Sequence, residues 1–144
     1  MGLFDFAKNF GNKIFGKDDD DAGEKLQAHI EEDNPGVEGL SVTVVDGVAT
    51  ITGEAESASA YEKAVLMAGN ALGVDSVEAA GLTAPEQTYE VTYYEIQKGD
   101  SLWKIADKFY GNGSKYEKIF EENREVIKDP DKIFPGQKIR IPMD

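Results

Sequence analysis

The chain has 144 residues, a formal net charge of −13 and no cysteine, so its length suits one average domain or two small ones. Without cysteine, disulfides, thiolate metal sites and a cysteine nucleophile are excluded, and so acidic a chain is a poor partner for nucleic acid, whose phosphates need clustered Lys and Arg. No run of 18 consecutive apolar residues occurs, so the sequence offers no candidate membrane span.

The first segment, residues 1–22, combines an apolar helical face with an acidic run at 18–21. The apolar residues are spaced by three or four positions, as on one face of a helix; they are Leu3, Ala7, Phe10 and Ile14. Gly11 weakens this helix, which we expect to bend or end there. Docking on the next domain or lying on a membrane surface would both cover the apolar face, and the scarcity of lysines favours docking.

This N-terminus does not match a secretory signal. Asp5, Lys8 and Lys13 interrupt any apolar core, and the acidic run occupies the place where small residues would be needed for cleavage. We therefore expect a cytoplasmic protein, and we expect it to be a monomer.

Residues 23–84 predict the element order α-β-β-α-β. A helix over 23–33 ends at Asn34-Pro35-Gly36. Two strands follow, at 40–44 and 48–53, and Asp46-Gly47 between them is a strong hairpin signal.

The second helix of this region begins, by its sequence, at a capping box in which Ser59 pairs with Glu62. It continues to Gly73, a natural left-handed cap, and residues 74–82 form the last strand. The hairpin VTVVDGVATITG, the helix ending NALGV and the strand DSVEAAGL together resemble a BON domain. Residues 85–88 are then a short linker.

Residues 89–144 contain GDSLWKIA, FYG and PGQKIRIP in that order, and they resemble a LysM domain throughout. The resemblance implies a β-α-α-β fold, and the whole chain is therefore expected to be α+β. We expect Trp103, Ile105, Ile119 and Phe120 to lie in the core of this domain. Either Asp100 or Ser101 caps the first helix, and Ser114 caps the second through Glu117.

The LysM resemblance also implies a glycan-binding groove. In that family the turn before the first helix and the loop before the last strand border a site for N-acetylglucosamine chains. Here the corresponding residues are Gly99, Asp100, Ser101, Asp129 and Pro130.

A BON domain followed by a LysM domain, behind the opening MGLFDFAKNFG, resembles the family of small bacterial potassium-binding proteins called Kbp or YgaU. This resemblance covers essentially the whole chain. It implies a cytoplasmic protein that binds K⁺ in preference to Na⁺ and changes conformation when it does so.

K⁺ is large and weakly hydrated, and it is matched by several neutral carbonyl oxygens rather than by a cage of carboxylates. Helix C-termini offer unpaired carbonyls at the negative end of the helix dipole. Two such ends stand out, one at the bend of the N-terminal helix near Gly11 and one at the end of the helix before Gly73. Together with the resemblance they predict a shared site. The carbonyl donors we name are Ala7, Phe10, Asn12, Gly69, Ala71 and Val74. Ordinary helix capping is the alternative for either end alone.

No catalytic constellation is visible. His29 is the single histidine, and it lies within a predicted helix with no nucleophile in a recognised arrangement. We therefore predict a K⁺ sensor or buffer and not an enzyme. The alternative is a cell-envelope binding module whose LysM domain holds peptidoglycan.

Overall fold

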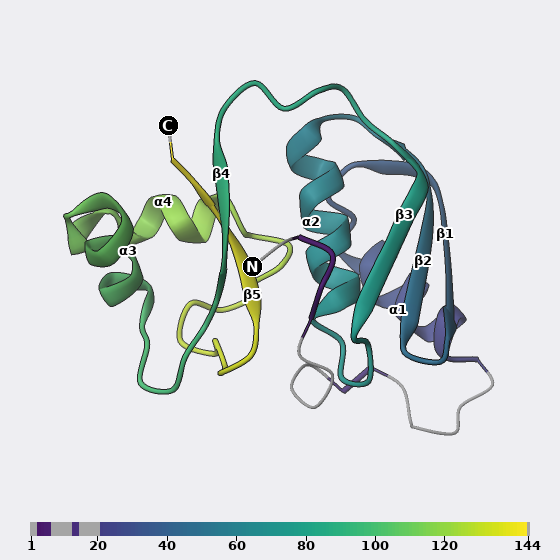
Figure 1. Ribbon diagram of the computed structural model, residues 1–144, viewed down its shortest axis with the longest axis horizontal. Coiled ribbons are helices and arrows are strands. Elements are labelled where there is room, and N and C mark those ends of the chain that lie inside the picture. Colours follow the sequence, from purple (N-terminus) through teal and green to yellow (C-terminus); the bar gives the residue numbers. More distant parts are fainter. Residues whose placement is uncertain (1–2, 7–12, 15–20, 144) are drawn as a thin grey trace.

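A computed structural model describes residues 3–6, 13–14 and 21–143, and it shows an α+β chain with two small domains side by side (Figure 1). The first domain has the expected order α-β-β-α-β: α1 (Ala22–Glu32), β1 (Val37–Val45), β2 (Val48–Ala55), α2 (Ala58–Gly69) and β3 (Ser76–Thr83). The second has the expected β-α-α-β order with a 3-10 turn: β4 (Val91–Glu95), α3 (Leu102–Tyr110), η1 (Gly113–Lys115), α4 (Tyr116–Glu121) and β5 (Lys138–Pro142).

The first domain is built on a three-stranded sheet in the order β1-β2-β3. β1 and β2 are antiparallel and join through Asp46-Gly47, both with positive φ, as the hairpin signal predicted. β3 runs parallel to β2 because α2 crosses over between them. Alternate residues such as Val42 and Ile51 are buried while Thr43 and Thr52 are not, so one face of the sheet carries the core.

The start of α2 differs from the predicted capping box. The helix begins at Ala58, and its N-cap is Ser57, whose side chain accepts a hydrogen bond from the Ala60 N–H at 3.0 Å. Ser59 and Glu62 instead form hydrogen bonds with residues of the second domain. The helix also ends at Gly69, earlier than predicted, although Gly73 does have the positive φ expected of it.

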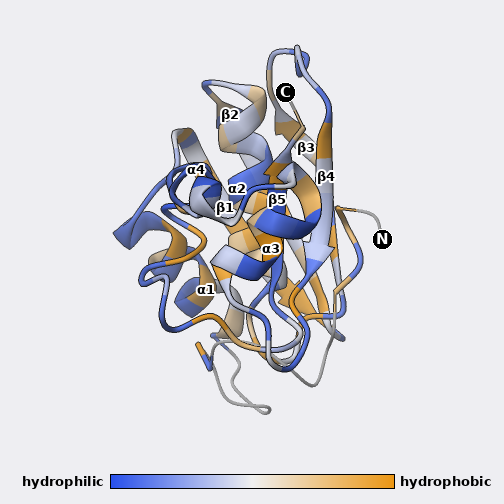
Figure 2. Cartoon of the chain, turned by 90° about the vertical axis from the view of Figure 1, so that its left-hand side faces the viewer, coloured by the Kyte–Doolittle hydropathy of each residue, from blue (hydrophilic) through white to orange (hydrophobic). Residues whose placement is uncertain are grey.

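Helix α2 is buried on nearly every side. Its buried residues are Ala60, Glu62, Ala64, Val65, Leu66, Met67, Ala68 and Gly69. One side packs on the sheet and the other faces β4 and β5 of the second domain (Figure 1). Such burial is typical of a helix in an interior. Figure 2 shows hydrophilic residues on the turns of α3, at the outside of the second domain.

The helix predicted near the N-terminus does not include residues 3–6. Asp5 forms an antiparallel bridge with Ser76 at the beginning of β3. The Phe6 N–H donates to Asp75 O and the Val77 N–H donates to Phe4 O, each at 3.0 Å. Residues 3–6 therefore pair with the edge of β3 as extended chain. Residues 7–12 of the predicted helix lie outside the described residues.

The second domain pairs β4 with β5 in antiparallel register and buries Ile105 and Ile119 as expected. Ser101 caps α3 by accepting from the Lys104 N–H at 3.1 Å. The core prediction is wrong for Trp103, which is 54% exposed and lies with its ring against Gly113.

The cap predicted at Ser114 is also wrong. Asn112 caps the turn before α4, and its side chain accepts from the Ser114 N–H at 3.0 Å. The short 3-10 helix that begins at Gly113 comes before α4, so Ser114 lies inside a turn rather than at a helix start.

Candidate functional site

The C-terminal end of α2 brings together several buried residues. Gly69, Asn70, Ala71 and Val74 are all buried there. Their N–H groups turn back into the helix end: Asn70 donates to Leu66 O at 2.9 Å, and Val74 donates to Ala71 O at 3.2 Å. The last carbonyls of a helix carry the negative end of its dipole, so this end attracts positive charge.

The N-terminal segment meets this helix end from two directions. The Phe6 ring packs against Gly69 so closely that any side chain there would overlap it. Ile14 lines a cavity of about 280 Å³ together with Met67 and Asn70. Residues on both sides of 7–12 therefore lie at the end of α2.

Three of the six predicted carbonyl donors can be placed in the structure. Gly69, Ala71 and Val74 lie together at the end of α2, as their sequence spacing implied. The other three, Ala7, Phe10 and Asn12, fall outside the described residues, and their role stays a prediction.

A lysine that the sequence analysis missed reaches the same place. Lys138, on β5, is only 1% exposed. The Asn70 side chain holds its backbone in two hydrogen bonds of 2.8 Å, one to Lys138 O and one from Lys138 N–H. Its Nζ donates to the Asp5 carbonyl and lies 4.4 Å from the centroid of the Phe6 ring. Burial lowers the pKa of Lys138, although Asp5 and Glu95 oppose this.

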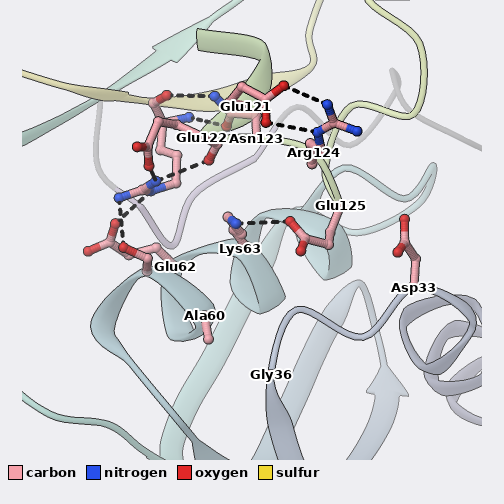
Figure 3. Close-up of polar contacts among 12 residues, drawn as sticks. Asp33, Gly36, Ala60, Glu62, Lys63, Glu121, Glu122, Asn123, Arg124 and Glu125 are labelled. Atoms are coloured by element: carbon pink, nitrogen blue, oxygen red, sulfur yellow. Dashed lines mark hydrogen bonds and ion pairs between the residues drawn. The ribbon is translucent and has the colours of Figure 1, made fainter. Parts of the chain in front are cut away.

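A second buried network lies at the other end of α2, centred on Arg140 of β5. The Arg140 guanidinium donates to Glu62 Oε1 at 2.9 Å, to Glu122 Oε2 at 2.8 Å and to Tyr89 Oη at 2.8 Å. Gln87 of the linker donates to the second Glu62 oxygen at 2.9 Å. Figure 3 shows Glu62 and Glu122 converging from the two domains.

Burial alone would lower the pKa of Arg140, but its hydrogen bonds to Tyr89, Glu122 and Glu62 raise it above the ordinary arginine value. Further out, Lys63 pairs with Glu125 at 2.9 Å, also visible in Figure 3. The two domains are thus joined by hydrogen bonds and ion pairs and not by apolar packing alone.

The predicted glycan-groove residues have structural roles in the described chain. Asp100 Oδ2 accepts from the Gln97 N–H at 2.8 Å and from the Tyr94 hydroxyl at 2.5 Å. Burial, together with this bond to Asp100, raises the pKa of Tyr94 to about 12.

The second loop of the predicted groove folds on itself and touches the first domain. Asp129 Oδ1 accepts from the Asp131 N–H at 2.9 Å, next to Pro130. The preceding Lys128 forms an ion pair of 2.8 Å with Asp33 of the first domain. Sugar binding by Gly99, Asp100, Ser101, Asp129 and Pro130 stays a prediction.

Side-chain metal clusters and long apolar helices are both lacking in the described part of the chain. Within residues 3–6, 13–14 and 21–143, no group of three or more His, Asp or Glu side chains is arranged to hold a metal ion. Over the same residues, no helix has the length and apolar character needed to cross a membrane.

Comparison with known proteins agrees with this two-domain layout. The BON domain family matches residues 18–83, and the LysM domain family matches residues 94–142. The potassium binding protein Kbp of Escherichia coli O6:H1 is 39% identical to the chain, over 99% of both proteins. The chain belongs to the Kbp family.

Other relatives of this Kbp-family protein share only part of it. An uncharacterized protein of Deinococcus radiodurans is 40% identical over 80 residues, which are 49% of this chain and 31% of that protein. SpoIVD-associated factor A of Bacillus subtilis is 45% identical over 49 residues, 34% of this chain and 12% of that protein.

Proposed function

We propose that this protein binds K⁺ through backbone carbonyls of the N-terminal segment and of the end of α2. The observation that carries the proposal is the meeting of these two segments: Phe6 lies on Gly69, and Ile14 lines a cavity with Asn70. The donors proposed are those named from the sequence, Ala7, Phe10, Asn12, Gly69, Ala71 and Val74. The relative Kbp, a potassium binding protein by name, supports the same ion.

The chemistry of the helix end fits a large monovalent cation. Its candidate donors are neutral carbonyls, which suit K⁺, whereas Ca²⁺ and Mg²⁺ prefer carboxylates and water. Gly69, Ala71 and Val74 are buried, so an ion bound there would exchange its water for protein oxygens. The side chain of Lys138 already places a positive charge nearby, because its ammonium donates to the carbonyl of Asp5.

We further propose that the protein is a cytoplasmic sensor or buffer for K⁺ that prefers it to Na⁺. An ion that binds only the ordered state stabilises that state by RT ln(1 + [L]/Kd), about 2.7 kcal/mol at 100 times Kd. Such a gain is a large share of the stability of a small domain, so binding can order the N-terminal segment.

The test is a titration of K⁺-depleted protein with KCl and with NaCl at constant ionic strength, followed by calorimetry and thermal unfolding. Heat of binding and a rise in melting temperature with K⁺, but not with Na⁺, are expected. Equal responses to the two salts would reflect screening of the −13 charge and would refute a K⁺ site.

The LysM match favours a second candidate, a module that holds peptidoglycan or other N-acetylglucosamine chains in the cell envelope. Its residues would be Gly99, Asp100, Ser101, Asp129 and Pro130. Titration with chitin oligosaccharides, followed by NMR of these residues, distinguishes the two functions because K⁺ binding predicts no shift there.

A further inference from the structure

Lys138 belongs to the second domain, yet its side chain crosses to the end of α2 in the first. We infer that Lys138 is a built-in competitor of the cation site, whose ammonium weakens K⁺ binding to the carbonyls at that helix end. The inference rests on the proposed K⁺ site and concerns how tightly that site binds.

The position of Lys138 is fixed at both of its ends. At the backbone, Asn70 is the C-cap residue of α2, and its side chain accepts from and donates to the Lys138 peptide groups. At the tip, Nζ donates to Asp5 O beside Phe6, and the Phe6 ring lies on Gly69. The side chain therefore runs from Asn70 to Asp5 along the end of α2.

The partners of this ammonium are the kinds that also attract K⁺. A lysine ammonium donates hydrogen bonds and accepts none, so carbonyl oxygens satisfy it, and an aromatic face adds cation–π attraction. Lys138 is 1% exposed, so water screens its charge poorly. A second cation at the neighbouring carbonyls must bind against that charge.

This arrangement also makes the second domain a determinant of ion affinity. Lys138 and Arg140 lie two residues apart on β5; Lys138 bonds to the C-cap residue Asn70 and Arg140 to Glu62 of α2. Any change that moves β5 away from α2 would withdraw the ammonium from the helix end. By linkage, K⁺ binding would in turn weaken the hold of Lys138 on that end.

The experiment removes the charge while keeping most of the length of the side chain. Lys138→Met in the full chain is compared with Lys104→Met, an exposed lysine of α3 on the far side of the second domain, which makes the same change in net charge (Figure 1). K⁺ affinity is measured with KCl by calorimetry, and K⁺-induced stabilisation by thermal unfolding. Lys138→Met should bind K⁺ at least about ten-fold more tightly, and Lys104→Met should change affinity less than about two-fold.

Equal or weaker K⁺ binding by Lys138→Met, with the wild-type chain binding normally, would overturn this inference and leave the proposed function intact. Binding by neither protein would overturn both, whereas binding by the variant alone would support the inference. Lys138→Gln is measured beside it, with circular dichroism to confirm folding, so that a folding defect in one variant does not decide the result. Gain of affinity in each variant that folds supports competition, and no gain in a variant that folds overturns it.

Discussion

Arg140 Nε on β5 lies 2.9 Å from Glu62 Oε1 on α2, and the two side chains are 0% and 7% exposed. The pair joins residues of different domains. Removing two charges from water is costly, so a buried pair is held only where its other hydrogen-bonding groups are also satisfied. Here Glu122, Tyr89 and Gln87 complete those bonds.

Arg140→Met should therefore destabilise the protein strongly. The change leaves Glu62 buried with no opposite charge, and removing one partner of such a pair typically costs about 3–5 kcal/mol. Urea unfolding followed by circular dichroism measures the loss. The matched control is Arg124→Met, which breaks an exposed pair with Glu121 and should change stability much less, because water screens that pair. Similar small losses in both variants would show that water enters and solvates Glu62.

Ser57→Ala should lower stability by about 1 kcal/mol, because its side chain accepts the Ala60 N–H at the start of α2. Glycine at the same position should cost only a few tenths of that, since it tolerates the N-cap backbone. Denaturant midpoints of the two variants provide the measurement. If Ser57→Ala caused no loss of stability, the side-chain hydrogen bond would not hold the helix start.

The sequence predicted those parts of the fold that depend on neighbouring residues. Asp46-Gly47 predicted the hairpin because only a few residues accept two successive positive φ angles, and Asn34-Pro35-Gly36 predicted the end of α1. The start of α2 was misplaced because Ser59 and Glu62 fit a capping box in isolation. Their true partners lie about 80 residues away in sequence on Arg140, which no local pattern reveals.

The candidate site is predictable only in part for a related reason. Backbone carbonyls belong to every residue, so the sequence indicates a carbonyl site only through helix ends and through glycines such as Gly69. Lys138 appears in the sequence as one polar position of a closing strand. Its role at the end of α2 depends on how the two domains pack, and that packing is decided by contacts distant in sequence.

Tyr94 should remain protonated well above pH 10. Burial and its bond to Asp100 raise its pKa to about 12, from an ordinary value near 10. Because the folded pKa lies above the unfolded one, the stability that this group contributes is complete below about pH 10 and is lost as pH rises through 12. NMR of tyrosines labelled at Cζ follows its titration directly.

The matched variant is Tyr94→Phe, which removes both the ionisable group and its bond to Asp100. Its stability should fall less steeply than that of the wild-type protein between pH 10 and pH 12. Titration of Tyr94 near pH 10 in the folded protein would contradict its partly buried hydrogen bond to Asp100.

Gly69→Ala should weaken K⁺ binding and destabilise the protein by about 1–3 kcal/mol, because the new methyl group overlaps the Phe6 ring. Phe6→Ala removes that ring, so the double variant should lose less than the sum of the two single losses. Thermal unfolding and KCl titration of all three variants complete the cycle. Additive losses would mean that Phe6 and Gly69 do not touch in solution.

Deleting residues 1–17 should abolish K⁺ binding, because it removes half of the proposed donors together with Phe6. The deletion takes away one aspartate and three lysines, so the remaining chain is more negative and long-range attraction for cations increases. Loss of binding therefore cannot come from net charge.

The control converts Asp18, Asp19, Asp20 and Asp21 to Asn, which lowers the negative charge but keeps every proposed carbonyl. Its K⁺ affinity, measured by calorimetry, should fall less than about ten-fold, since salt screens exposed charges over about 8–10 Å. The reverse pattern would be an Asn variant that no longer binds K⁺ and a deletion that binds it normally. That result would locate the ion among the carboxylates of the acidic run.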